Sequence, residues 1–178
     1  MIVTSSSNAV RDLVETKYSG VDKIKFIVRP KELELKTKPL AETIKYVLSK
    51  ENINYNTIQV VSPDFPFVEA YSIDDAINTM YLFNSDSLVS VREDNHMFFQ
   101  HHGDGMTPIF NQNKFTKLER ETLYKSIGGI SVVRKHIFEE TNEIVTGKVG
   151  HLMLDEKASI EINSKFLLDI VKLILSNE

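Results

Sequence analysis

The order of apolar and polar residues predicts strands and helices that alternate over the first half of the chain. Short apolar or alternating runs, each ended by a polar turn, predict strands near residues 1 to 4, 24 to 28, 57 to 61 and 87 to 92. Between these runs, apolar residues recur at helical spacing, in residues 9 to 14, 40 to 48 and 73 to 83. Because parallel neighbouring strands need long connections, this alternation predicts an α/β fold with a mainly parallel sheet covered by crossover helices.

Capping residues indicate where two of the helices begin. Ser72, with Asp75 three residues later, resembles a capping box for a helix over residues 73 to 83. Asp74 and Asp75 would then lie in its first turn, where carboxylates interact favourably with the helix dipole, so a capping role is favoured over acid/base chemistry. A last amphipathic helix begins near Ser164.

The pattern changes after Arg92. Residues 97 to 100 and 106 to 110 flank the turn His101–Gly105, which predicts a β-hairpin arm with a glycine-permitted turn. Strands near residues 130 to 134 and 149 to 154, with a short helix near residues 135 to 140 between them, return the chain to the sheet. With no internal repeat or linker, the prediction is a single domain over residues 1–178, with an arm over about 94–126.

Composition narrows the function classes. The 178 residues carry 21 basic and 25 acidic side chains and a net charge of -4, so no basic face for nucleic acid is expected. No stretch is long and apolar enough to suggest a membrane span. The chain has no Cys, which excludes disulfides, thiolate metal sites and thiol nucleophiles. No secretory leader follows Met1, so a cytoplasmic location is expected.

Two polar patterns are weak candidates for chemistry. His101, His102 and Asp104 are metal-ligand types, but adjacent residues of a strand point to opposite faces, which favours a plain polar hairpin tip. The pair Gly147–Lys148 is typical of a phosphate loop only when a glycine stands five positions earlier, and that residue is Asn142. No dinucleotide-binding glycine motif is present either.

Two further segments have an open interpretation. In residues 159 to 163, alternation puts Ser159, Glu161 and Asn163 on one side, where their oxygens suit magnesium; alternatively, Asn163 or Ser164 caps the last helix. Residues 62 to 67 follow the end of a predicted central strand, which is where open α/β sheets place ligands. Their two prolines equally explain a rigid structural turn.

Motifs spread over nearly the whole chain resemble one family. In the first third of the chain, Ile2–Ser5 resembles a strand ending in Thr-Asp, and Arg29-Pro30 with Glu32-Leu33 resembles Arg-Pro-x-Glu-Leu. Next, Pro63 and Pro66 resemble the prolines of Gln-Pro-Thr-Ser-Pro-Leu-Arg, and Ile73–Ile77 and Ser87–Val91 follow in the expected places. In the last third, Leu123–Ile130 resembles Leu-Tyr-x-x-Asn-Gly-x-Ile, and Ser159–Asn163 resembles Ser-Ile-Asp-Ile-Asp. In this order they resemble the acylneuraminate cytidylyltransferase family, the sugar nucleotidyltransferases that make CMP-sialic acids and related CMP-sugars.

The resemblance carries expectations about fold, activity and site. It implies a Rossmann-like sheet of the nucleotide-diphospho-sugar transferase type, transfer of CMP from CTP to an acidic sugar (sialic acid or a related nonulosonic acid) with magnesium, and a homodimer formed through the arm 94–126. By the same resemblance, the substrate-binding residues are Ser62, Asp64, Tyr124 and Lys148, and the metal ligands are Glu161 and Asn163.

Departures from the family pattern are expected to weaken catalysis. The sequence starts after the family's first strand and its basic glycine-containing loop. Because that strand lies centrally in the family's sheet, its absence is expected either to expose backbone edges or to bring two other strands together. Ser62 replaces the motif Gln, Val68 the motif Arg, Ile127 the motif Asn, and Glu161 and Asn163 the two metal aspartates. Phosphoryl-type transfer depends on cationic and metal stabilisation, and one lost stabilising group costs about 3 kcal/mol. The prediction is therefore a weak or inactive cytidylyltransferase-like protein, or alternatively a non-catalytic member that acts as a binding, regulatory or partner subunit.

Overall fold

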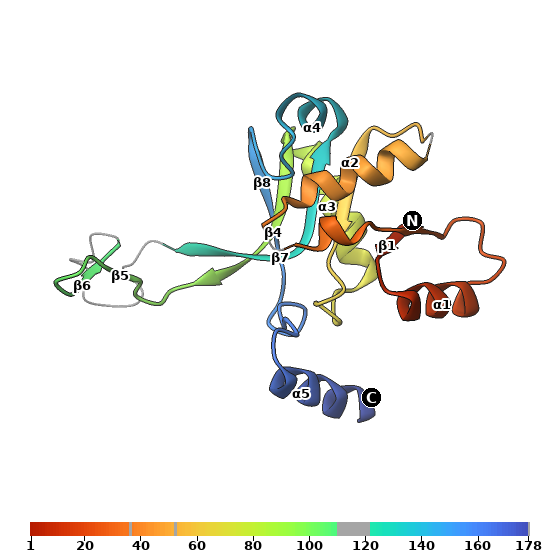
Figure 1. The fold of residues 1–178 in the computed structure, drawn as a ribbon. Coiled ribbons are helices and arrows are strands. Elements are labelled where there is room, and N and C mark those ends of the chain that lie inside the picture. The colour runs from red at the N-terminus through yellow and green to blue at the C-terminus, as the bar shows by residue number, and fades with distance from the viewer. Residues whose placement is uncertain (36, 52, 110–121, 178) are drawn as a thin grey trace. The chain divides into compact units, whose positions relative to one another are not determined.

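The computed structural model describes residues 1–35, 37–51, 53–109 and 122–177, and Figure 1 shows their helices and strands. The chain divides into two compact units, Met1–Asn56 and Thr57–Glu178. Each unit is described by itself, and a single domain over the whole chain stays a prediction.

The first unit contains a parallel pair of strands with a helical crossover. Its elements are β1 (Ile2–Ser5), α1 (Asn8–Lys17), β2 (Lys25–Val28), the 3-10 helix η1 (Lys31–Glu34) and α2 (Leu40–Lys50). β1 and β2 pair from Ile2 with Lys25 to Ser5 with Val28. The strand, helix, strand order predicted for this region is therefore confirmed, and α2 begins directly after Pro39, at the start of the helical pattern in residues 40 to 48.

The second unit contains a four-stranded sheet in the order β3-β7-β4-β8. Its elements are β3 (Thr57–Val61), α3 (Ala70–Leu82), β4 (Ser87–Asp94), β5 (Phe99–His101), β6 (Met106–Pro108), β7 (Leu123–Arg134), α4 (Lys135–Thr141), β8 (Val149–Met153) and α5 (Lys165–Ser176). β4 and β8 are parallel, whereas β7 is antiparallel to both β3 and β4. The predicted α/β fold class is confirmed, and β3, β4 and β8 share one direction. β7 opposes them because the chain reaches it through the arm and not through a crossover helix.

α3 packs on one face of this sheet and buries side chains of that face. Ala76 and Met80 of α3 pack against Leu88 of β4 and against Ile130 and Val132 of β7, and all five side chains are fully buried. The short apolar runs that predicted the strands therefore supply the core. None of the helices in the described residues is both long and apolar enough to cross a membrane.

β7 is longer than the sequence predicts, and it contains a bulge. Val89 pairs with Ser131 and Val91 with Ser126, so β7 has extra residues at this point. Gly128 has a φ of +72°, a conformation that glycine adopts readily. The Ile130 N–H donates to the Ser90 hydroxyl at 2.9 Å, which replaces a ladder hydrogen bond and keeps the two strands paired. The strand predicted near residues 130 to 134 therefore begins earlier, at Leu123, and contains both Gly128 and Gly129.

Of the two helix starts that capping residues predicted, the start of α3 is wrong and the start of α5 is confirmed. α3 begins at Ala70 after Glu69, and no side chain caps it, so the capping box at Ser72 is wrong and Asp74 lies in the second turn. Ser72 is buried inside the helix. At α5, the Ser164 hydroxyl accepts the Leu167 N–H at 3.2 Å, so Ser164, and not Asn163, caps this helix.

The predicted hairpin is confirmed in its described part. β5 and β6 pair antiparallel, from Phe99 with Pro108 to His101 with Met106. Gly103 and Gly105 in the turn both have positive φ. Residues 110–121 of the predicted arm lie outside the described residues.

The two-stranded sheet of the first unit and the four-stranded sheet of the second unit both have open edges. Within the described residues, β1 pairs with β2 alone, and β3 pairs with β7 alone. β1 and β3 therefore each have an edge that no other strand of the described residues pairs with.

Candidate functional site

The loop Ser62–Phe67 follows the carboxyl end of β3 and is anchored by two of its own aromatic side chains. Phe65 and Phe67 are buried, at 6% and 8% exposure. The Ser62 N–H donates to the Gly129 carbonyl at 3.0 Å, which continues the pairing of β3 with β7 by one residue. Asp64 is exposed, and its carboxylate accepts the Ser62 hydroxyl at 3.3 Å. The prolines do stiffen this turn, yet the turn also presents a carboxylate to solvent.

Gly129 in the bulge of β7 packs directly under this loop. A Cβ at this position would lie 3.2 Å from Cγ of Phe65, which is tighter than ordinary contact. Glycine therefore lets the backbone of β7 approach the ring. This close approach allows the loop to lie directly against the sheet.

The segment after β8 turns back toward the same loop. The Asp155 carboxylate accepts the Ala158 N–H at 2.7 Å, and the Ser159 hydroxyl donates to the Asp155 carbonyl at 2.5 Å. Ala158 is buried at 5% exposure. The Ile162 N–H then donates to the Asp64 carbonyl at 2.8 Å. This last hydrogen bond joins two segments that are distant in sequence.

The structure therefore brings together four residues that the sequence analysis proposed. Ser62 and Asp64 lie on one segment, and Glu161 and Asn163 flank Ile162 on the other. Asp64, Glu161 and Asn163 are exposed. The site lies beyond the carboxyl end of β3, the position at which α/β sheets place their ligands.

The site offers one carboxylate and one amide, donor types that magnesium accepts. Magnesium is typically held by one or two carboxylates, with phosphate oxygens and waters as its other ligands. Glu161 and Asn163 offer a carboxylate and an amide, but Ser159 donates its hydroxyl to a backbone carbonyl and belongs to the turn. No cluster of three His, Cys, Asp or Glu side chains is found in the described residues, so the protein alone provides few ligands.

Two residues proposed for substrate binding lie elsewhere. Tyr124 pairs with Glu93 where β4 and β7 extend beyond the sheet, and its ring centroid is 5.3 Å from that of His151. Lys148 lies at the amino end of β8, where its Nζ donates to the Phe83 carbonyl at 2.7 Å. Since β3 and β8 run in the same direction, Lys148 is at the opposite end of the sheet from Ser62.

A cation beside the site was not predicted. Nζ of Lys157 lies 5.1 Å from the centroid of the Phe67 ring, which places a positive charge next to the loop. No sequence motif pointed to Lys157. The burial of Phe65 and Phe67 could have been predicted from the sequence, because both are apolar residues within a turn that contains two prolines.

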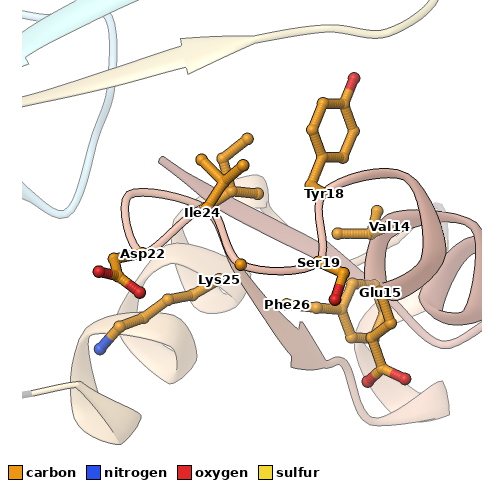
Figure 2. Close-up of a pocket in the computed structure, with 10 residues that line it drawn as sticks. Val14, Glu15, Tyr18, Ser19, Asp22, Ile24, Lys25 and Phe26 are labelled. Atoms are coloured by element: carbon orange, nitrogen blue, oxygen red, sulfur yellow. The ribbon is translucent and has the colours of Figure 1, made fainter.

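A separate hollow of about 530 Å³ lies in the first unit (Figure 2). Glu15, Tyr18, Asp22 and Lys25 are among its lining residues, and Lys25 forms an ion pair with Glu51 at 2.6 Å. The hollow lies at the amino end of β2, opposite to the usual ligand end of an α/β sheet. None of the residues proposed from sequence lines it.

Comparison with known proteins shows a shared fold. The sequence matches no protein-family model and no curated protein. The structure is similar to 4-diphosphocytidyl-2C-methyl-D-erythritol synthase from Anaerococcus prevotii, with a TM-score of 0.67 and 12% identity over 98% of this chain and 77% of that chain. It is also similar to CMP:2-keto-3-deoxy-manno-octonic acid synthetase solved with CTP, with a TM-score of 0.65 and 9% identity over 99% of this chain and 80% of that chain. At these identities the likeness shows a shared fold alone.

Proposed function

We propose that the chain is a cytidylyltransferase-type protein that binds CTP and an acidic sugar at the carboxyl end of β3 and transfers CMP weakly or not at all. The observation that carries the proposal is the hydrogen bond from the Ile162 N–H to the Asp64 carbonyl at 2.8 Å. It joins the two segments that resemble the sugar-binding and metal-binding motifs of acylneuraminate cytidylyltransferases. The fold shared with two proteins whose names contain a cytidylyl group or CMP supports the same class of ligand.

Each residue of the site has a role in this proposal. Glu161 and Asn163 hold magnesium, and magnesium, when bound, neutralises charge on the phosphates of CTP. Asp64 accepts hydrogen bonds from hydroxyl groups of the sugar, and the Ser62 hydroxyl orients that carboxylate at 3.3 Å. Lys157, beside the Phe67 ring, offers a positive charge for an anionic group of either substrate.

A second candidate is a non-catalytic binding or regulatory subunit of the same family. The observation that favours it is the ligand set itself, because an amide at Asn163 replaces one of two carboxylates at the metal position. One carboxylate attracts a divalent cation less strongly than two. A site of this kind can still bind a nucleotide while contributing little to the rate of transfer.

Pyrophosphate release and thermal stability together test both candidates. The chain is incubated with CTP, magnesium and a panel of nonulosonic acids, with Glu161→Ala as the control. Slow release above the control supports the enzyme. Stabilisation by CTP and magnesium without release above the control supports the non-catalytic candidate, because a ligand that binds the folded state raises Tm. Neither release nor stabilisation overturns the proposed function.

We also propose that the chain forms a homodimer through the arm 94–126. In the described part of the arm, the exposed apolar side chains include Met97, Phe99, Met106 and Ile109. A two-stranded ribbon with such a surface is marginal in isolation, so a partner surface would stabilise it. Sedimentation analysis of Phe99→Asp tests this: a monomer from a dimeric parent supports the arm interface, and an unchanged mass contradicts it.

A further inference from the structure

The outer edge of β8 has a row of backbone groups without a strand partner. Toward β4, the Lys148 carbonyl accepts the Asp86 N–H at 2.9 Å, and the Leu154 N–H donates to the Val91 carbonyl at 3.0 Å. Because alternate residues of a strand bond to the same side, Val149, His151 and Met153 direct their N–H and C=O groups away from β4. No other strand of the described residues pairs with this edge.

The side chains on this edge are apolar and exposed. Val149 is 46% exposed and Met153 is 44% exposed. Between them, His151 contacts the ring of Tyr124, which is 52% exposed. Natural edge strands usually carry a central charge, a proline or a bulge that prevents pairing with another chain. The sequence of β8 from Val149 to Met153 has neither a proline nor an acidic or lysine residue.

This edge is complementary to itself. Two copies related by a two-fold axis pair their edge strands antiparallel. The register that pairs all five residues of β8 sets His151 opposite the partner's His151, and Val149 opposite the partner's Met153. Lys148 precedes the strand and Asp155 follows it, so an antiparallel pairing places the end of one strand that carries a positive charge beside the end of the other that carries a negative charge. In a parallel pairing, like charges would lie together instead.

We propose that β8 is an interface for a second copy of this chain, which adds its own β8 antiparallel and joins the two four-stranded sheets into one. The strand lies at the outer side of the sheet of its unit (Figure 1). A pairing of five residues with a few apolar contacts is smaller than a standard interface of about 1,600 Å². The dimer is therefore weak. The fraction of chains in the dimer rises as the chain concentration increases from tens to hundreds of micromolar.

Lysine substitutions on the edge test the interface in solution. All variants in this experiment also carry Phe99→Asp, so that a dimer formed through the arm does not contribute to the measured mass. In this background, Val149→Lys combined with Met153→Lys abolishes the concentration-dependent dimer in sedimentation equilibrium. Leu82→Lys combined with Phe166→Lys is the matched control, since these side chains are also exposed apolar residues, at 79% and 72%, and lie on helices. The control keeps the dimer.

A single cysteine tests the register without relying on the lysine variants. The chain has no Cys, so His151→Cys introduces a single thiol per copy. Directly opposed residues of a hydrogen-bonded antiparallel pair have Cα atoms about 5.5 Å apart, within the roughly 4.4–6.8 Å range of a disulfide. With a mild oxidant, His151→Cys gives a cross-linked dimer, whereas Leu82→Cys at equal concentration does not.

Two results overturn the proposal. One is a Phe99→Asp parent that stays monomeric at hundreds of micromolar, with His151→Cys cross-linking no faster than Leu82→Cys. The other is a dimer that persists unchanged in the Val149→Lys, Met153→Lys variant, which would place the interface elsewhere. Circular dichroism of each variant checks that the fold is retained.

Discussion

The two ends of the four-stranded sheet use their polar residues differently. At the amino ends of β4 and β8, polar side chains hold the backbone: Asp86 accepts the Lys148 N–H at 2.8 Å, and Arg134 donates from Nε to a backbone carbonyl at 2.7 Å. The buried Ser87 hydroxyl donates to the Thr146 carbonyl at 2.6 Å and accepts the Thr146 N–H at 3.0 Å. Each of these polar groups therefore forms a hydrogen bond that holds the backbone at this end of the sheet.

At the carboxyl end of β3, buried aromatic rings and backbone hydrogen bonds hold the chain instead. Phe65 packs against Gly129, and the Ile162 N–H bonds to the Asp64 carbonyl. The side chains of Glu161 and Asn163 remain exposed, and no hydrogen bond in the described residues uses them. The comparison shows that apolar contacts and backbone hydrogen bonds stabilise this end of the sheet, whereas polar side chains stabilise the other end.

The largest effect is expected from removing the aromatic anchor of the carboxyl end. Phe65→Ala should lower the free energy of unfolding by about 3–5 kcal/mol, because it leaves a cavity beneath the loop. Urea denaturation measures the loss. Phe166→Ala, at a position 72% exposed, is the control and should change stability by no more than about 0.5 kcal/mol. A loss of less than about 1 kcal/mol for Phe65→Ala would show that the ring is not an anchor.

A smaller loss is expected at the amino end. Ser87→Ala leaves the Thr146 N–H and carbonyl without their buried partner and should cost about 2 kcal/mol. The increase in Tm that CTP and magnesium produce should be unchanged, since this end takes no part in the proposed site. Ser126→Ala, at an exposed position of β7, is the control for stability. A reduced response to CTP in Ser87→Ala would contradict the separation of the two ends.

Glu161→Gln should leave stability almost unchanged, within about 0.5 kcal/mol, because the carboxylate is exposed. It should remove most of the increase in Tm caused by magnesium and CTP, since the amide no longer attracts the cation. Thermal-shift titration of magnesium at fixed CTP measures both quantities. Glu156→Gln, an exposed acidic residue of the same segment, serves as the matched control. Equal responses in the two variants would exclude Glu161 as a ligand.

The smallest effect concerns pH, at the base of the arm. The pKa of Asp94 is lowered by hydrogen bonds from the backbone N–H and the ring of His96. A carboxyl with a lowered pKa in the folded state contributes stability that is present above its ordinary pKa, about 3.9, and is lost as pH falls through the folded value. Stability of Asp94→Asn should therefore depend less on pH below about 5. NMR titration of the Asp94 carboxyl at its ordinary pKa would contradict this.

Much of the fold could be predicted from sequence because buried strands show as short apolar runs. β3 was predicted at its observed bounds, and β2, β4 and β8 within one or two residues. The length of β7 could not be predicted, because the pairing of Ile130 with the Ser90 hydroxyl depends on a strand forty residues away. The start of α3 was also missed, since the Ser72 and Asp75 pattern suggests a cap wherever it occurs.

The candidate site could be predicted in part. Motif resemblance selected Ser62, Asp64, Glu161 and Asn163, which the structure places together. It also selected Lys148, whose backbone and side chain serve the amino end of the sheet. Sequence alone does not tell at which end of a sheet a lysine lies until the strand directions are known. Lys157 escaped notice because its position depends on a ring contact across two loops.

The antiparallel position of β7 between β3 and β4 also sets an order for folding during synthesis. Thr57 pairs with Arg134, so β3 cannot find its neighbour until residues long after it have left the ribosome. At about 5–20 residues per second, this delay is on the order of 4 to 15 s. During that interval, β3 and β4, which each contain two valines, have unpaired edges exposed to solvent or to a chaperone. The last strand to join the centre of the sheet thus decides how long the nascent chain is exposed to aggregation.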